Sequence, residues 1–166
     1  MQITWETFKR CIEEFQDLSN ELNDTWIIHK PETEENFTTY LTKKQFITPK
    51  NFEEESSIPV EYHVMYSISY GTPILCLNSW RNDGTLLTME ELWKCLNFTE
   101  DEDMYSTLTQ MDHPILQRPF LTLHPCRTGE ILENMFKDSR NIIVSWLSLV
   151  GPIVKLDVDL NYMKLT

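Results

Sequence analysis

The chain has 166 residues, 41% of them hydrophobic and 11% aromatic, with a formal net charge of −12. This length and composition are typical of a single domain over residues 1–166 that buries a core without disulfide or metal staples, and they exclude a disordered chain. The acidic balance argues against binding to nucleic acid or to an anionic membrane surface.

The hydrophobic pattern shows no targeting or membrane segment. The first ten residues lack a basic start followed by an apolar run, so no secretory signal is expected. The most apolar segment, residues 142–154, includes Ser145, Ser148, Gly151 and Pro152 and is shorter than the roughly 20 residues that span a bilayer. We therefore expect a cytoplasmic protein that does not insert into membranes.

Four cysteines are widely spaced, and no C-x-x-C pair is present. This spacing predicts reduced thiols and no zinc site. Cys11, Cys76 and Cys95 lie within apolar patterns, so we expect them to be packed and inert. Cys126 differs from them in its surroundings.

The N-terminal segment predicts an amphipathic helix from about Trp5 to Asn23. Large apolar side chains recur there at spacings of three, four and seven, and Thr4 is a suitable N-terminal cap. We expect the apolar stripe to pack on the core.

Strands are predicted next. Residues 37–47 are rich in β-branched and aromatic side chains. Residues 60–70 alternate, with Tyr62, Val64, Tyr66, Ile68 and Tyr70 on one face and polar side chains on the other. The Gly-Thr-Pro turn at 71–73 leads into a strand over 74–80, which indicates an antiparallel hairpin, and a second turn follows at 81–84.

The remaining half favours helices. Thr88 and Glu91 form a capping box that opens a short helix, whereas residues 97–113 have no firm period. Helices are predicted for residues 130–138 and 141–150, the second ended by Gly151 and Pro152. The alternating tail at 154–160 predicts a final strand or an extended segment. This order of elements predicts an α+β fold.

The stretch FLTLHPCRTGE at 120–130 reads as a short strand, a cysteine and a helix start. A helix N-terminus and the neighbouring Arg127 both favour the thiolate of Cys126. Thr128 can cap this helix, Glu130 suits its first turn, and His124 lies two residues before the sulfur. Cys126 is therefore the candidate nucleophile.

Two kinds of acyl transfer fit a nucleophilic cysteine after a strand. A cysteine protease would need a base, and His63 and His113 are available by residue type. A thioester exchange is nearly isoenergetic and demands only an accessible thiolate and a docked partner. Composition does not decide between them.

Three blocks carry a resemblance to a known family. They are EYHVMYS at 61–67, HPIL at 113–116 followed by LHPC at 123–126, and SWLSLVGP at 145–152. In this order they closely resemble the autophagy E2-like conjugating enzymes. The resemblance implies an E2-like core: an N-terminal helix on a four-stranded antiparallel sheet with extra strands, the catalytic cysteine after the last core strand, then two helices, without the usual C-terminal E2 helices.

The resemblance also implies an activity. Cys126 would take the ubiquitin-like modifier autophagy protein twelve from its E1, autophagy protein seven, as a thioester. It would then pass the modifier to a lysine of autophagy protein five during autophagosome formation. No metal or organic cofactor is implied. A non-catalytic E2-like binding module remains the alternative, followed by a cysteine protease.

The motif departs from that of ordinary ubiquitin E2 enzymes, where His-Pro-Asn precedes the cysteine and the Asn helps to stabilise the oxyanion. Here His124 and Pro125 run directly into the cysteine, so another group must orient the attacking lysine. The candidates are Tyr70, Asp112 and His113, each of which also has a purely structural interpretation. Exposed edges at the strands 37–47 and 60–70 are candidate docking surfaces.

Overall fold

The computed structural model describes residues 2–30, 37–49, 57–96, 108–125, 128, 132–133 and 139–166. Its elements in chain order are α1 (Trp5–Leu22), β1 (Ile27–His29), β2 (Tyr40–Ile47), β3 (Ile58–Ser67), β4 (Thr72–Ser79), α2 (Met89–Leu96), β5 (Leu108–Asp112), β6 (Pro119–Leu123), α5 (Ile142–Val150) and the 3₁₀ helices η1 (Gly151–Val154) and η2 (Leu160–Leu165). Within these ranges, no helix combines the length and hydrophobicity that a bilayer crossing requires.

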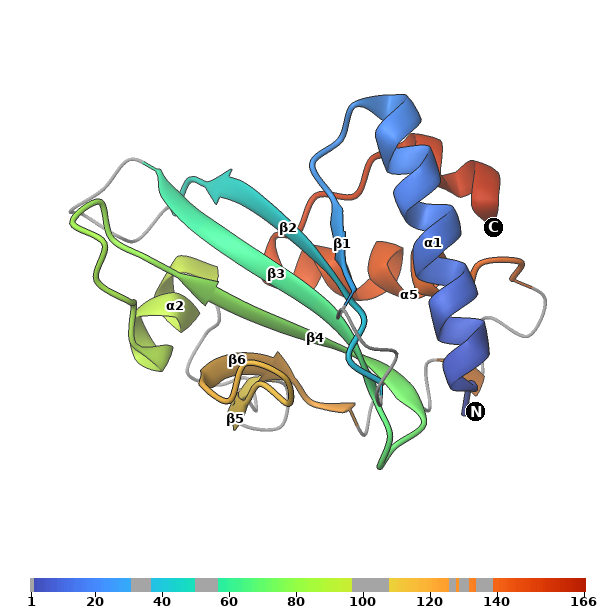
Figure 1. Cartoon of the computed structure of the whole chain (residues 1–166). Coiled ribbons are helices and arrows are strands. Elements are labelled where there is room, and N and C mark those ends of the chain that lie inside the picture. The colour runs from blue at the N-terminus through green and yellow to red at the C-terminus, as the bar shows by residue number, and fades with distance from the viewer. Residues whose placement is uncertain are drawn as a thin grey trace.

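The strands form one six-stranded antiparallel sheet in the order β1-β2-β3-β4-β6-β5. The long strands β3 and β4 lie at its centre, as Figure 1 shows, and form the hairpin that the turn at 71–73 predicted. Strand β3 is internal, so the prediction that it offers a free edge was wrong, whereas the pairing of β2 with β1 covers only Tyr40–Thr42 and does not extend to Lys43–Ile47. The sheet ends instead at β1 and β5.

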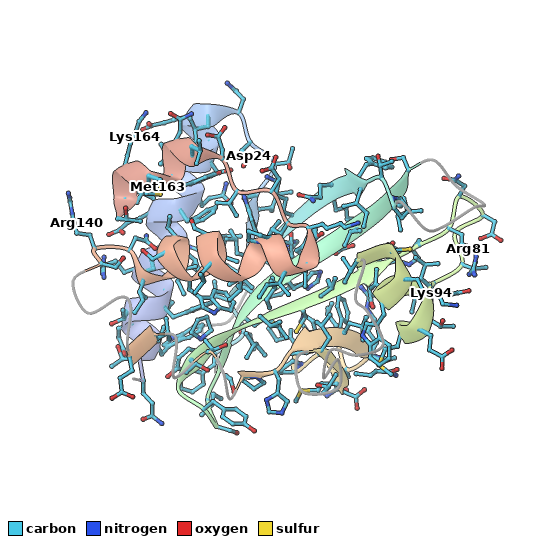
Figure 2. All side chains as sticks on the ribbon, turned by 180° about the vertical axis from the view of Figure 1, so that it is seen from behind. Asp24, Arg81, Lys94, Arg140, Met163 and Lys164 are labelled. Carbon is cyan, nitrogen blue, oxygen red and sulfur yellow. The ribbon has the colours of Figure 1, made fainter. Side chains whose placement is uncertain are left out.

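The main core lies between one face of the sheet and the helices α1 and α5, which Figure 2 shows from behind with α5 across the sheet. Leu41, Tyr62, Val64, Leu75 and Leu77 come from the strands and are fully buried. The opposite face, called here the outer face, carries a smaller cluster formed by Met65, Ile74, Cys76 and Phe120. The outer face is therefore covered only in part, and Phe46 of β2 is 72% exposed.

The helix ends follow from local sequence. The Thr4 hydroxyl accepts a hydrogen bond of 3.1 Å from the amide of Thr7, and α1 ends at Asn23 in the left-handed conformation. At α2, the amide of Thr88 donates to the Glu91 carboxylate and the amide of Glu91 donates to the Thr88 hydroxyl. The predicted α1, its cap and the capping box are confirmed.

Strand β3 ends at Ser67, three residues earlier than its alternation predicts. The amide of Gly71 donates to the carbonyl of Ser67 at 2.8 Å, and Gly71 adopts φ 61°, which closes a tight turn. Ile68 and Tyr70 therefore lie in the turn, 63% and 42% exposed, and do not extend the buried face. Likewise β2 begins at Tyr40, three residues after Phe37.

The tail is not a strand. Its apolar residues Val154 and Leu156 are buried as alternation predicts, but the segment is bounded by η1 and η2, and Leu160 is 84% exposed. Strands β1 and β5 were not predicted. Helix α5 is confirmed and continues into η1 at Gly151. The helix predicted over 130–138 lies outside the described residues, apart from 132 and 133.

Candidate active site

The predicted nucleophile, Cys126, lies outside the described residues, as do Arg127 and Glu130. The structure describes the chain up to Pro125, which is buried, and His124, which is half-buried. The site must therefore be located from the strand that leads into it.

Strand β6 directs the chain toward the β3–β4 turn. It runs antiparallel to β4, with Leu121 opposite Leu77 and Thr122 opposite Cys76, so each later residue lies nearer to Thr72. Figure 1 shows the chain after β6 continuing toward that end of β4. His124 and Pro125 thus lie at the end of the sheet where β3 turns into β4.

Tyr70 lies in that same turn, between Ser67 and Thr72, which face each other across β3 and β4. Its side chain is 42% exposed. The fold therefore brings Tyr70 and the His124-Pro125 dipeptide to one end of the sheet, although they are 54 residues apart in sequence (124 minus 70).

Asp112 and His113 lie at the other end of β6. Asp112 faces Pro119, whereas Leu108 faces Leu123. The start and the end of β6 are four residue steps apart, which is about 13 Å at about 3.3 Å per residue. The structure does not bring these two candidates together with His124.

His113 is 1% exposed and its side chain is fully engaged. Nδ1 accepts hydrogen bonds from the amides of Ile115 and Leu116, at 3.2 and 3.1 Å. Nε2 lies 2.9 Å from Nδ1 of His63, whose own Nε2 lies 2.8 Å from Oε1 of Glu61. Neither histidine therefore has a ring nitrogen free to serve as the base that a protease would need.

Burial sets the protonation of both rings. Desolvation lowers the pKa of His113 to about 4, and the neighbouring His63 and Arg118 act in the same direction. Desolvation also lowers the pKa of His63, although its hydrogen bond to Glu61 opposes the shift. Both imidazoles are neutral at pH 7.

The other thiols are poor nucleophiles. Cys11, Cys76 and Cys95 are buried thiols rather than disulfide partners, which confirms that they are packed. Burial raises the pKa of the Cys11 thiol and raises that of Cys76 to about 12. Among the described residues, moreover, no three His, Cys, Asp or Glu side chains are grouped so that they could hold a metal ion.

Comparison with known proteins decides the family. The model of the family described as autophagocytosis associated protein, active-site domain, matches residues 3–161. The chain belongs to this family. The resemblance carried by the three sequence blocks is thereby confirmed.

Several curated relatives share one name, ubiquitin-like-conjugating enzyme ATG10. The Homo sapiens protein is 41% identical over 119 residues, which cover 66% of this chain and 54% of the relative. The Dictyostelium discoideum protein is 31% identical over 123 residues, which cover 63% of this chain and 54% of the relative. The Arabidopsis thaliana protein is 29% identical over 116 residues, which cover 62% of this chain and 52% of the relative. The alignments thus cover about half the length of these relatives.

A solved structure described as the crystal structure of autophagic E2, Atg10, has the same fold. The TM-score is 0.60 at 16% identity, over 92% of this chain and 98% of the other. The expected E2-like architecture, with an N-terminal helix on an antiparallel sheet and helical segments after the core, is confirmed.

Proposed function

We propose that this chain is an E2-like conjugating enzyme that carries a ubiquitin-like modifier as a thioester on Cys126. The observation that carries the proposal is the family match over residues 3–161, which spans the LHPC block at the end of β6. The shared name of the relatives, ubiquitin-like-conjugating enzyme, supports the same chemistry.

The proposed reaction has two acyl transfers. The Cys126 thiolate attacks the carbonyl carbon of the thioester between the modifier and its E1, a new thioester forms, and the E1 thiolate leaves. A lysine amine of the acceptor then attacks the thioester on Cys126. An isopeptide bond forms, the amine loses a proton, and the Cys126 thiolate leaves. Because one thioester replaces another, the first step needs no cofactor.

The finer assignment names the partners. We propose autophagy protein seven as the E1, autophagy protein twelve as the modifier and autophagy protein five as the acceptor, in the cytoplasm during autophagosome formation. This rests on the family resemblance of the three sequence blocks and on the names of the relatives. Acceptor lysine deprotonation is proposed to depend on Tyr70, which lies at the same end of the sheet as His124.

A charging assay tests the proposal. The chain would be mixed with the E1, the modifier and ATP, then run on a non-reducing gel beside Cys126→Ala and the matched buried-thiol variant Cys11→Ala. We expect a larger band that thiol reductant removes, that Cys11→Ala retains and that Cys126→Ala lacks. Cys126→Ser should instead give an oxyester band that survives reductant.

Two results of the charging assay would contradict the proposal. If the E1 is charged with the modifier but no adduct forms on the wild-type chain, the conjugating function is wrong, and a non-catalytic E2-like binding module takes its place. An adduct that persists in Cys126→Ala would assign the chemistry to another residue.

A further inference from the structure

Two buried histidines and a glutamate form a hydrogen-bonded chain on the outer face of the sheet. Glu61 and His63 come from the central strand β3, and His113 begins the turn between β5 and β6. Both imidazoles are almost fully buried, at 2% and 1% exposure. None of the three groups has a part in the proposed thioester chemistry.

The hydrogen bonds fix every proton in this chain. His113 Nδ1 accepts from two backbone amides, so the proton of that ring is on Nε2. Nε2 therefore donates to Nδ1 of His63, at 2.9 Å. The proton of His63 is then on its own Nε2, which donates to the Glu61 carboxylate at 2.8 Å. Only the doubly neutral state satisfies all four bonds.

The chain of bonds holds a turn against the sheet. Besides its side-chain bonds, His113 donates its amide to the carbonyl of Arg118, and its own carbonyl accepts from Gln117, both at 2.9 Å. The turn places Ile115 and Leu116 against the outer-face cluster. Strand β6 begins directly after this turn, so the placement of the turn also places β6.

We propose that Glu61, His63 and His113 form a proton-sensitive latch that holds the β5–β6 turn on the sheet and opens when the pair of imidazoles gains one proton. A proton on His113 Nδ1 would point at the two amides that now donate to it. A proton on His63 Nδ1 would face the Nε2–H of His113. If His113 changed tautomer to accept it, the two amides would lose their acceptor. Each arrangement breaks at least one bond of the latch.

The charged groups around His63 and His113 favour the neutral state of both imidazoles. Lys44 Nζ lies 3.3 Å from Oε2 of Glu61. Burial alone would raise the pKa of the Glu61 carboxyl, but the hydrogen bond from His63 and the Lys44 charge lower it overall, so Glu61 stays ionised.

Three further groups face the two rings. The cationic Arg118, over the ring of Phe120, disfavours a second positive charge, and so does His29 at the far side of Tyr40. Tyr40 stacks on His63 with ring centroids 5.4 Å apart, and burial raises the pKa of its hydroxyl, so it remains neutral. Among the charged side chains described around the two rings, only the Glu61 carboxylate favours a charged imidazole at this position; a backbone hydrogen bond at His113 acts in the same direction.

The latch positions β6 and, through it, the segment that enters the LHPC block. His63 and His113 are therefore positioning residues for this segment, whatever modifier the chain carries. Acid would loosen the β5–β6 turn while the main core on the other face of the sheet stays packed.

Nitrogen chemical shifts of the imidazoles test the proton positions in the unmodified chain. At pH 7.5, both His63 and His113 should show a protonated Nε2 and a bare Nδ1, with a scalar coupling across the hydrogen bond between the two rings. A protonated Nδ1 on either ring at this pH would overturn the latch, and no variant is needed for this measurement.

Amide hydrogen exchange tests the opening. Protection factors at Leu116 and Phe120 should fall by up to about tenfold for each pH unit below about 6.5, relative to those of α5. The variant His113→Asn keeps an oxygen that can accept from the amides of Ile115 and Leu116, but it cannot be protonated there. Its β6 protection should be lower at pH 7.5 and should lose most of the pH dependence.

The control is His29→Asn, which removes an exposed imidazole of the same outer face that bonds Thr42. Because His29 opposes a positive charge on His63, its removal should displace the pH dependence to slightly higher pH while leaving the tenfold slope in place. Equal pH dependence of β6 and α5 in the wild-type chain would overturn the proposal, as would full retention of the slope in His113→Asn.

Discussion

The hydroxyl of Tyr62 donates a hydrogen bond of 2.7 Å to the carbonyl oxygen of Val154, 92 residues later in the chain, and both residues are fully buried. Tyr62 lies on the central strand β3, and Val154 ends η1. The bond therefore ties the segment after α5 to the middle of the sheet. Burial raises the pKa of this hydroxyl well above its usual value, so it remains a donor.

Tyr62→Phe should destabilise the chain by about 1–3 kcal/mol, because the ring still fits but the Val154 carbonyl is left buried without a donor. Urea unfolding followed by circular dichroism measures the loss. Tyr66→Phe is the matched control, since the Tyr66 hydroxyl bonds the Ile3 carbonyl in a partly buried position, and it should cost less. If both substitutions lowered the free energy of unfolding equally, burial of the accepting carbonyl would not determine the size of the loss.

Asn141 joins α5 to α1. Its side-chain oxygen caps α5 by accepting from the amide of Val144, and its Nδ2 donates to the Cys11 carbonyl and the Glu14 carboxylate, each at 2.9 Å. Asn141→Ala should cost roughly 2–4 kcal/mol, the sum of a lost cap and an unpaired buried carbonyl. Thermal and urea unfolding measure this.

Asn141→Asp separates the two roles. It keeps an oxygen for the Val144 amide but turns a carboxylate toward the Cys11 carbonyl and Glu14. We expect it to be at least as destabilising as Asn141→Ala. If Asn141→Asp left the free energy of unfolding unchanged, the cap alone would account for the role of this residue.

The sequence predicted those elements whose local signals agree with their tertiary environment. Helix α1 has a regular apolar stripe and a capping threonine, and the β3–β4 hairpin has alternation and a Gly-Thr-Pro turn. Strand β5 was missed because its edge position leaves Gln110, Met111 and Asp112 exposed, so no apolar period marks it. Strand β1, with three residues, is too short to show a period.

The outer face of the sheet shows the limit of pattern reasoning. Alternation predicted His63 as a polar, outward-facing residue of β3, yet it is 2% exposed because the turn after β5 covers it. The partner that explains its burial, His113, is 50 residues away. Only the pairing of β4 with β6 brings the two together, and no local signal encodes it. The pairing of β5 with β6 separates Asp112, which the sequence offered as a candidate site residue, from His124.

Lys43 and Asp24 form a partly buried ion pair. The distance from Lys43 Nζ to Asp24 Oδ1 is 2.9 Å, the ammonium also lies over the Trp26 ring, and Tyr162 donates to the same carboxylate. Figure 2 shows Asp24 near η2, where that hydroxyl comes from. Asp24→Asn should cost about 1–3 kcal/mol, because Lys43 stays charged beside a weaker acceptor.

The exposed pair of Lys30 and Glu13 is the control for that substitution. At 57% and 44% exposure it is screened by water, so Glu13→Gln should change stability by less than about 1 kcal/mol. Chemical unfolding of both variants in low and high salt checks the difference. A cost for Glu13→Gln that matched Asp24→Asn would contradict the role given to burial.

Acid should destabilise the whole chain in two separate ranges. Desolvation places the pKa of His113 at about 4, below its unfolded value of about 6.5, so the unfolded chain binds more protons between these values. Stability is complete above about pH 6.5 and falls by up to about 1.4 kcal/mol per pH unit for this histidine as the pH decreases toward 4.

Asp24 and Glu61 act in the lower range. Burial alone would raise the pKa of each carboxyl. The hydrogen bond and charge of Lys43 lower the pKa of Asp24 overall, and His63 and Lys44 lower that of Glu61. Their contribution is present above the unfolded pKa of about 4 and is lost below it. Unfolding in urea at a series of pH values measures both ranges, and a flat profile from pH 7 to 4.5 would contradict the histidine assignment.

The placement of β6 gives different expectations for Tyr70 and Asp112. Tyr70 shares the β3–β4 end of the sheet with His124, and Asp112 lies at the opposite end of β6. Under the proposed function, Tyr70→Phe should slow transfer of the modifier to lysine about a hundredfold or more, a typical contribution of a group that assists proton transfer. It should leave charging of Cys126 nearly unchanged, because thioester exchange needs no base. Asp112→Asn should alter neither step.

Single-turnover assays separate the two steps. The charged chain is isolated from the E1, and loss of the thioester is followed with and without the acceptor, for the wild type and both variants. An equal effect of Tyr70→Phe on charging and on discharge would make Tyr70 structural. A discharge defect specific to Asp112→Asn would mean that the acceptor lysine approaches from the other end of β6, more than a strand's length from the segment that enters the cysteine.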